Sequence, residues 1–394
     1  MLSLASNISS TQAVEAKYSA VFDGTDDFVD CGLIDFNTND FSVSCWIKVR
    51  EWTQYSVIWG NRSDSSNENI GVSLRTTGVT GELQLFSDWG TPTDSSIVTG
   101  VPADTWIHVV CTGDRDGDQV IYLNHDDATT TTDISDRSSV DFTSDLEFRI
   151  GRSHSNHYHN MSISQLGVWN VALSANAVEA LYNNGKPINL RINQGNYASS
   201  SNLQQYYKFG DGSFDDKAKG IVHDQDNPGF GSNLLAGNNS TFDGANDWTA
   251  YNAPSGTTTL STTGGVLQVT LSGAGNGVDS GARLNTSTLY GVAVGKVYKV
   301  KAEIWLGTST TTTGWRIFMG GVTVSLADAG GSISSNRTTF TTYIKPTTTG
   351  QLTIFNTDTD SDTGTFFIDN VSVKELNGNP GVTSGGVTFS SDTP

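Results

Sequence analysis

The sequence predicts an all-β protein made of two antiparallel β-sandwich domains in tandem, with one short helix near residues 174–183. Three observations lead to this fold class. Apolar and polar residues alternate with a period of two in many short segments, of which 41–49 is a clear example. Turn-forming Gly, Asp and Asn separate these segments, and the 394 residues include 42 Gly. Threonine runs such as 129–132 and 310–313 favour strands and turns over helix.

The first group of expected strands lies between residues 18 and 169. Besides 41–49, it comprises 56–59, 70–74, 82–86, 106–112, 119–123, 146–150 and 163–169. A helix is expected next, because Ser174 is a good N-cap and Asn183-Asn184-Gly185 is a typical helix end. The second group comprises 265–271, 297–306, 315–319, 338–344, 350–356 and 365–373.

These groups divide the chain into five expected segments. They are an N-terminal arm at 1–17, a first sandwich at 18–210, a linker at 211–232, a second sandwich at 233–376 and a C-terminal tail at 377–394. The last segment is rich in Gly, Ser and Thr and has no packing signal, so we expect a tail or an assembly arm.

The charge balance excludes two classes of partner. Acidic residues outnumber basic ones 41 to 22, which gives a net charge of −19. Nucleic acids and anionic membrane surfaces both require clusters of Lys and Arg, so neither is an expected partner. No apolar run approaches the roughly 18 residues of a membrane span, so no membrane insertion is expected.

The three cysteines, Cys31, Cys45 and Cys111, all lie in strand-like segments. Their odd number and their apolar neighbours favour buried free thiols over a disulfide.

Several motifs of the first sandwich occur in a characteristic order. They are Phe22-Asp23-Gly24, Phe41–Lys48, Asp104–Val109, Ile150-Gly151-Arg152 and Ile163–Trp169, followed by the short helix. In this respect residues 18–210 resemble the laminin-G-like, concanavalin-A-like jelly roll. The resemblance implies a jelly-roll fold, but the family includes lectins, adhesion modules and glycanases, so it leaves the ligand open.

The second sandwich carries another set of motifs. They are Asn233-Leu234-Leu235, Phe242-Asp243-Gly244, Gly295–Val300 and Phe367–Leu376. Residues 233–376 resemble a galactose-binding-like or carbohydrate-binding-module sandwich. Two such modules in one chain resemble bacteriophage virion surface proteins, such as capsid decoration proteins and tail fibres.

The beginning of the chain, Met-Leu-Ser-Leu-Ala-Ser-Asn, lacks a basic region followed by a sustained apolar region. We therefore expect a protein made in a host cytoplasm without a signal peptide and located on the virion surface. The expected function is glycan binding without catalysis, with other virion proteins as partners and several copies or a homo-oligomer on the particle. The alternatives are an extracellular bacterial lectin or glycanase accessory module, and a purely structural capsid or fibre protein.

Catalysis is not expected, because jelly-roll glycanases resemble one another in a Glu-x-Asp-x-Glu strand motif that this chain lacks. The nearest run is Asp145-Leu146-Glu147, with Arg149 on the same face, and this pattern favours an ion pair.

The best candidates for a structural Ca²⁺ are Asp243 and Asp369, because similar sandwiches hold the ion at these positions. Glu is more usual at the first of them. The acidic runs 114–118 and 358–364 favour turns over calcium loops. Three histidines, His154, His157 and His159, leave a metal site, a glycan contact and an intersubunit contact open.

A sugar ring stacks on a flat aromatic side chain, so an aromatic residue on the polar face of a strand marks a candidate site. In 298–306, Trp305 lies on the polar face with Glu303, and in 315–319, Arg316 and Phe318 face outward. If the two strands are neighbours, these four residues form one sugar platform. Trp89, in a turn, is a further candidate contact.

Overall fold

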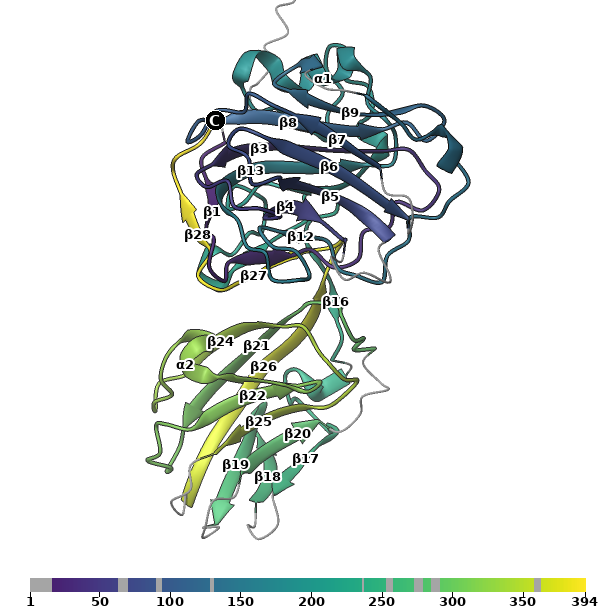
Figure 1. The fold of residues 1–394 in the computed structure, drawn as a ribbon. Coiled ribbons are helices and arrows are strands. Elements are labelled where there is room, and N and C mark those ends of the chain that lie inside the picture. Colours follow the sequence, from purple (N-terminus) through teal and green to yellow (C-terminus); the bar gives the residue numbers. More distant parts are fainter. Residues whose placement is uncertain are drawn as a thin grey trace, which may run out of the picture. The chain divides into compact units, whose positions relative to one another are not determined.

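The computed structural model confirms an all-β protein with a short helix (Figure 1). It describes residues 16–62, 70–89, 94–127, 131–235, 237–252, 258–272, 279–284, 291–357 and 363–394, with the backbone alone at residues 70, 88, 89, 127, 252 and 272. The expected arm at 1–17 therefore lies outside this description except for its last two residues. The chain forms two compact units, Met1–Gly229 with Asn377–Pro394, and Phe230–Leu376.

Two antiparallel sheets form the first unit. The described strands of its nine-stranded sheet are β1 (Ser19–Asp23), β3 (Phe41–Val49), β8 (Ile107–Gly113), β9 (Asp118–Leu123), β10 (Asp126–Asp127), β11 (Thr132–Asp133), β13 (Asn160–Trp169), β14 (Leu203–Tyr207) and β28 (Thr388–Ser390). The eight-stranded sheet has the order β15 (Ile221–Val222), β27 (Gly381–Ser384), β2 (Phe28–Asp30), β12 (Arg149–Ile150), β4 (Val57–Gly60), β5 (Ile70–Thr76), β6 (Leu83–Trp89) and β7 (Asp94–Val98).

The apolar faces of these two sheets share one core. Phe22 and Val43 come from the nine-stranded sheet, and Trp59 and Leu74 come from the eight-stranded sheet; all four are fully buried. Cys31, Cys45 and Cys111 are free and buried in the same core, as predicted. Burial raises the pKa of the Cys45 and Cys111 thiols, so neither is a reactive thiolate.

The expected helix is α1 (Ala175–Tyr182). The Ser174 side chain accepts a hydrogen bond from the Ala177 N–H at 3.3 Å, and Asn183 ends the helix in a left-handed conformation with φ 47°. A second, single-turn helix is α2 (Leu326–Gly330). The short 3₁₀ segments are Ser135–Arg137, Asn183–Gly185, Ser200–Asn202, Lys217–Lys219 and Gly237–Asn239.

Residues 377–394 are not a tail, contrary to the sequence prediction. Strand β27 pairs with β15 and β2, and β28 pairs with β1, where Phe389 lies opposite Ala20. The physical reason is that β1 and β2 have backbone donors and acceptors that the rest of the first unit leaves unpaired, and buried backbone groups require partners. The C-terminal residues supply them, so the second unit is an insertion into the first rather than its successor.

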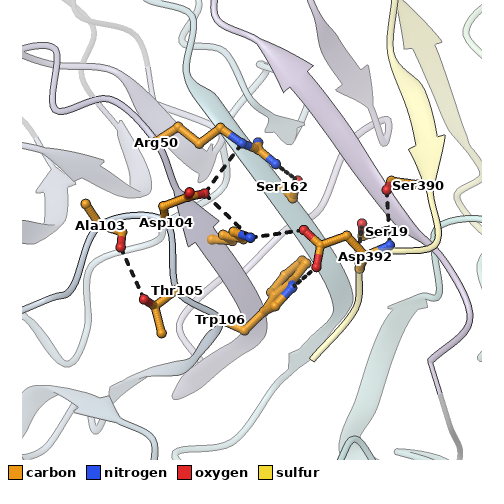
Figure 2. A network of polar contacts seen from close by, with 10 residues as sticks. Ser19, Arg50, Ala103, Asp104, Thr105, Trp106, Ser162, Ser390 and Asp392 are labelled. Carbon is orange, nitrogen blue, oxygen red and sulfur yellow. Dashed lines mark hydrogen bonds and ion pairs between the residues drawn. The ribbon is translucent and has the colours of Figure 1, made fainter.

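Figure 2 shows how side chains fix this returning segment. The Asp392 carboxylate accepts hydrogen bonds from Trp106 Nε1 and Lys48 Nζ, both at 3.1 Å. The Ser19 hydroxyl donates to the Asp392 carbonyl oxygen at 2.6 Å. Partial burial opposes ionisation of Asp392, but the hydrogen bonds from Trp106 and Lys48 outweigh it and lower its pKa.

Residues 211–229, expected as most of a linker, also belong to the first unit. Ile221 and Val222 are buried and form β15. The Asp215 carboxylate accepts hydrogen bonds from the backbone N–H groups of Gly210, Gly212 and His223. A buried apolar pair and a half-buried carboxylate therefore order a segment whose Gly and Asp content suggested a connection.

Two further antiparallel sheets form the second unit. The described strands of its six-stranded sheet are β16 (Phe230–Asn233), β18 (Thr258–Thr263), β19 (Val266–Ser272), β21 (Tyr298–Leu306), β24 (Thr338–Ile344) and β26 (Thr363–Leu376). The five-stranded sheet has the order β17 (Trp248–Asn252), β20 (Ser280–Leu284), β25 (Leu352–Asn356), β22 (Trp315–Met319) and β23 (Val322–Ser325). Side chains of both sheets share a second core, which includes Val300, Ile304, Ile317 and Ile354.

The ends of the inserted unit meet. Phe230, its first residue, pairs with Leu376, its last, through β16 and β26. In the first unit, the Asn377 N–H donates to the Gly229 carbonyl oxygen at 3.1 Å. The chain therefore leaves the first unit and re-enters it at neighbouring points.

Candidate functional site

The four residues of the expected sugar platform lie on two different sheets. Trp305 and Glu303 are on β21, which lies between β24 and β26 in the six-stranded sheet. Arg316 and Phe318 are on β22, which lies between β25 and β23 in the five-stranded sheet. The two strands are not neighbours, so the single platform does not form. Alternation along each strand identified the outward side chains correctly but carried no information on strand pairing.

Trp305 belongs to a compact cluster on the outer face of the six-stranded sheet. Its ring stacks on Phe367 with centroids 5.3 Å apart, and the Arg337 guanidinium lies 4.8 Å from its centroid. Arg337 also forms ion pairs with Glu303 and Asp369. Burial opposes ionisation of Glu303, but hydrogen bonds from Asn370 and Arg337 outweigh it and lower its pKa. This cluster already satisfies its own charges.

An open pocket of about 240 Å³ lies on the outer face of the five-stranded sheet. Phe318, one of the predicted glycan contacts, lines it. The alternation along β25 defines this face, because Leu352 and Ile354 point into the core while Thr353 and Phe355 line the pocket. The lining residues are Tyr251, Asp279, Phe318, Thr323, Gln351, Thr353 and Phe355.

Three aromatic rings give the pocket its apolar walls. Tyr251 on β17 and Phe355 on β25 are two strands apart in the sheet, and their rings meet edge to face at 5.5 Å and 71°. Gly281 on β20 lies opposite both residues in the strand register. A Cβ at Gly281 would come within 2.8 Å of the Phe355 side chain. The glycine therefore permits the contact between the two rings across an intervening strand.

The polar groups of the pocket are Asp279, Thr323, Gln351 and Thr353. Partial burial raises the pKa of Asp279, and the charge of Arg316 opposes this rise. Thr353 lies on the central strand of the sheet and is 1% exposed. Its Oγ1 is buried and has no hydrogen-bond partner in the described part of the chain. An unpaired buried hydroxyl costs free energy, which a ligand hydroxyl recovers when the Thr353 side chain rotates toward the pocket.

Sequence reasoning missed Tyr251, Phe355 and Thr353. Strand β17 was not expected, because its five residues fall outside the segments with clear alternation. Phe355 and Thr353 lie in the expected strand 350–356, and their alternation with Leu352 and Ile354 was the signal that could have identified them.

The remaining predicted site residues are dispersed. Trp89 is the last residue of β6, and its side chain is outside the described set. Asp243 is exposed, whereas Asp369 is buried and pairs with Arg337. The Ca²⁺ site at Asp243 and Asp369 stays a prediction. The acidic run 358–362 is also outside the described residues.

The acidic run at 114–118 forms the turn that was predicted. The Gly117 N–H donates to the Asp114 carbonyl oxygen at 3.0 Å, between β8 and β9. Glu147 and Arg149 form the predicted ion pair at 3.4 Å.

The three histidines of the 154–159 loop do not converge in the described structure. His159 is buried, while His154 Nε2 contacts the Glu147 carbonyl oxygen at 2.8 Å and His157 Nδ1 lies 3.5 Å from Ser153 Oγ. Of the described residues, only Asp23, Asp26 and Asp27 group closely enough to offer three metal ligands. Asp27 already accepts hydrogen bonds from the Asp23 and Gly386 N–H groups.

Sequence comparison identifies the kind of domain that the first unit contains. Residues 23–179 match a family model described as the concanavalin A-like lectin/glucanases superfamily. This match confirms the expected jelly-roll kind for that part of the chain. Curated proteins offer no significant sequence match.

Solved structures with similar parts include three of different origin. A candidate carbohydrate-binding protein from Bacteroides ovatus is 19% identical, with a TM-score of 0.40 over 54% of this chain and 56% of that one. A heptameric SAP-like pentraxin from Limulus polyphemus is 16% identical, with a TM-score of 0.35 over 42% of this chain and 82% of that one. Domain 4 of an extracellular GH43 arabinanase from Geobacillus stearothermophilus, solved with arabinotriose, is 21% identical. Its TM-score is 0.33 over 42% of this chain and 76% of that one.

The chain thus spans little more than half of the Bacteroides ovatus protein. All three identities are below 25% and all three TM-scores are below 0.5, so these structures do not identify a ligand for this chain. Neither helix in the described ranges has the length and apolar character needed to cross a membrane.

Proposed function

We propose that this protein binds glycans through the pocket on the outer face of the five-stranded sheet, without catalysing their hydrolysis. The observation that carries the proposal is the combination of aromatic walls with a buried, unpaired Thr353 hydroxyl. Ligand sites of this kind join apolar surface with a few placed polar groups. Aromatic rings stack on the C–H faces of a sugar, while the side chains of Asp279 and Gln351 form hydrogen bonds with its hydroxyls.

The non-catalytic part of the proposal rests on the carboxylates. Glycosidases with two catalytic carboxylates place them about 5–10 Å apart. Asp279 is the single carboxylate that lines the described part of this pocket. Assays of reducing-sugar release from a polysaccharide panel should therefore show no turnover, and measurable release would revive the enzyme hypothesis.

A glycan array with three variants tests the binding site. Phe318→Ala and Tyr251→Ala each remove one wall of the pocket, so each should weaken binding at least about tenfold, equal to about 1.4 kcal/mol. Trp305→Ala is the matched control, because Trp305 is an aromatic residue on the other sheet of the same unit. If only Trp305→Ala loses binding, the site lies at the Trp305 cluster, and if the wild-type protein binds no glycan, the function is wrong.

We further propose that the protein acts on the surface of a bacteriophage virion, as a capsid decoration protein or a tail-fibre adhesin, in several copies with other virion proteins. This proposal rests on the sequence resemblance of the two sandwiches to modules of such proteins. Mass spectrometry of purified particles tests it. Finding the chain in bacterial culture supernatant instead would favour a bacterial lectin or glycanase accessory module, and a particle-bound chain that binds no glycan would favour a structural protein.

A structural Ca²⁺ at Asp243 and Asp369 is a separate proposal. The ion would compete with Arg337 for the Asp369 carboxylate. Thermal unfolding in Ca²⁺ and in a chelator tests it: the melting temperature of the second unit should rise with Ca²⁺, and this rise should disappear in Asp243→Asn. Equal melting temperatures for the wild-type protein in both buffers would contradict the proposal.

A further inference from the structure

We infer that the pocket takes a single sugar ring at the end of a glycan, rather than the interior of a polysaccharide chain. This inference deepens the proposed function and rests on it. Three features of the described pocket carry the argument: its size, the angle between its aromatic rings, and the depth of its unpaired hydroxyl.

The pocket is small. Its volume is about 240 Å³, below the roughly 300–1,000 Å³ of clefts that bury drug-sized ligands. A monosaccharide has about half the atoms of such a ligand. The volume within the described walls therefore suits one ring, and the neighbours of a ring inside a chain would have to lie outside these walls.

Two of the three aromatic rings, those of Tyr251 and Phe355, form a corner rather than a flat floor. A polysaccharide chain that lies along a sheet needs rings in roughly one plane, so that successive sugars can stack on them. Here Tyr251 and Phe355 meet at 71°. Two rings at this angle can contact one face and one edge of the same sugar, but they cannot stack on two consecutive sugars of one extended chain.

Thr353 gives the site its depth. Its strand is central, with two strands on either side, and its side chain is 1% exposed. The protein covers its Oγ1, so a ligand hydroxyl at the inner end of the bound ring reaches this atom when the Thr353 side chain rotates toward the pocket. A ring in the middle of a chain carries glycosidic bonds at two positions and enters less deeply, whereas a terminal ring can insert its free end.

The first test compares ligand lengths on the full chain. The probes are the methyl glycosides of glucose, galactose, mannose, xylose, arabinose and N-acetylglucosamine, together with the linear tetrasaccharides of each, measured by isothermal titration calorimetry. We expect the best monosaccharide glycoside to bind within about threefold of the tetrasaccharide that ends in the same sugar. A tenfold or larger gain from one ring to four would overturn the inference while leaving glycan binding intact. No binding of any probe would instead contradict the proposed function.

The second test uses Thr353→Val, which removes the hydroxyl and keeps the shape. Because Oγ1 has no described partner in the protein, the melting temperature of the variant should be unchanged or higher. Binding of the monosaccharide should fall at least tenfold. Thr339→Val is the control, since Thr339 is exposed on β24 in the other sheet of the same unit and does not line the pocket. Unchanged affinity in Thr353→Val would overturn the inserted-end geometry.

Discussion

Two histidines buried in the first unit connect its stability to pH. His108 and His159 are 2% and 1% exposed. Burial lowers the pKa of each imidazole to about 4, from an ordinary value of 6.5. Between these two values the unfolded chain binds a proton that the folded chain does not, so the free energy of unfolding falls as the pH drops from about 6.5 to about 4.

His159→Phe should reduce this acid sensitivity. One such histidine destabilises the folded state by about 2 kcal/mol between pH 7 and pH 5, and the variant no longer carries this loss. Urea unfolding of both proteins at the two pH values measures the difference. His125→Gln, at an exposed position, is the control and should keep the wild-type dependence. An identical pH dependence in His159→Phe and the wild-type protein would contradict the prediction.

Protonation of Asp224 changes the free energy of unfolding in the opposite direction to protonation of the two histidines. Comparing His159→Phe with the wild-type protein is therefore more informative than the pH profile of the wild-type protein alone. Burial raises the pKa of this carboxyl to about 6. Between about pH 6 and pH 4 the folded state holds a proton that the unfolded state releases, so this group adds stability on acidification. The total profile is the sum of contributions with opposite signs.

At the scale of the elements, the C-terminal strands decide whether the first unit is complete. Strands β27 and β28 close two edges, and Asp392 ties the end of the chain to Trp106 and Lys48. Deleting residues 381–394 should prevent stable folding of the first unit and leave the second unit folded. Hydrogen exchange measured by mass spectrometry would show lost protection in β1 and β2 together with retained protection in β21 and β26.

Asp392→Asn is the milder companion of that deletion. It should cost about 1 kcal/mol, because the carboxylate is partly exposed and its bonds are charge-assisted. For the deletion of residues 381–394, wild-type protection from hydrogen exchange in β1 and β2 would show that β27 and β28 are dispensable.

The cap of α1 offers a second prediction at this scale. Ser174→Ala removes the acceptor for the Ala177 N–H and should destabilise the first unit by about 1 kcal/mol. Ser174→Asp restores the acceptor and should recover most of the loss in a urea titration. A loss that Asp does not recover would assign it to packing rather than to the cap.

The sequence predicted the positions of strands and of the helix along the chain better than it predicted which strands pair with each other. Alternation located most strands and the helix, because those signals are local. It could not show that β21 and β22 belong to different sheets, since pairing depends on residues far apart in the chain. It also misjudged residues 377–394, because short strands rich in Gly, Ser and Thr are stabilised by their partners and carry little signal themselves. Phe318 was identified from alternation, and Phe355 carried the same local signal, whereas Tyr251 was missed because β17 lacks clear alternation.

At the scale of the whole molecule, the insertion makes the two units separable. The Gly229 carbonyl oxygen and the Asn377 N–H are 3.1 Å from each other, so a short link can replace everything between them. Replacing residues 230–376 with a Gly-Ser linker of four residues should give a first unit with a single cooperative unfolding transition. Residues 230–376 expressed alone should fold and retain the glycan binding proposed for the pocket. Failure of both pieces to fold, when the full chain does, would show that the units depend on each other.

The late position of β27 and β28 affects the order of events on the ribosome. The partners of these strands, β1 and β2, emerge early, but the inserted unit of residues 230–376 must be translated before the closing strands appear. At about 5–20 residues per second, those residues take roughly 7 to 30 s to synthesise. During that interval the nascent first unit exposes the unpaired edges of β1 and β2. The inserted unit, although it is synthesised later than these strands, can finish folding before the first unit does.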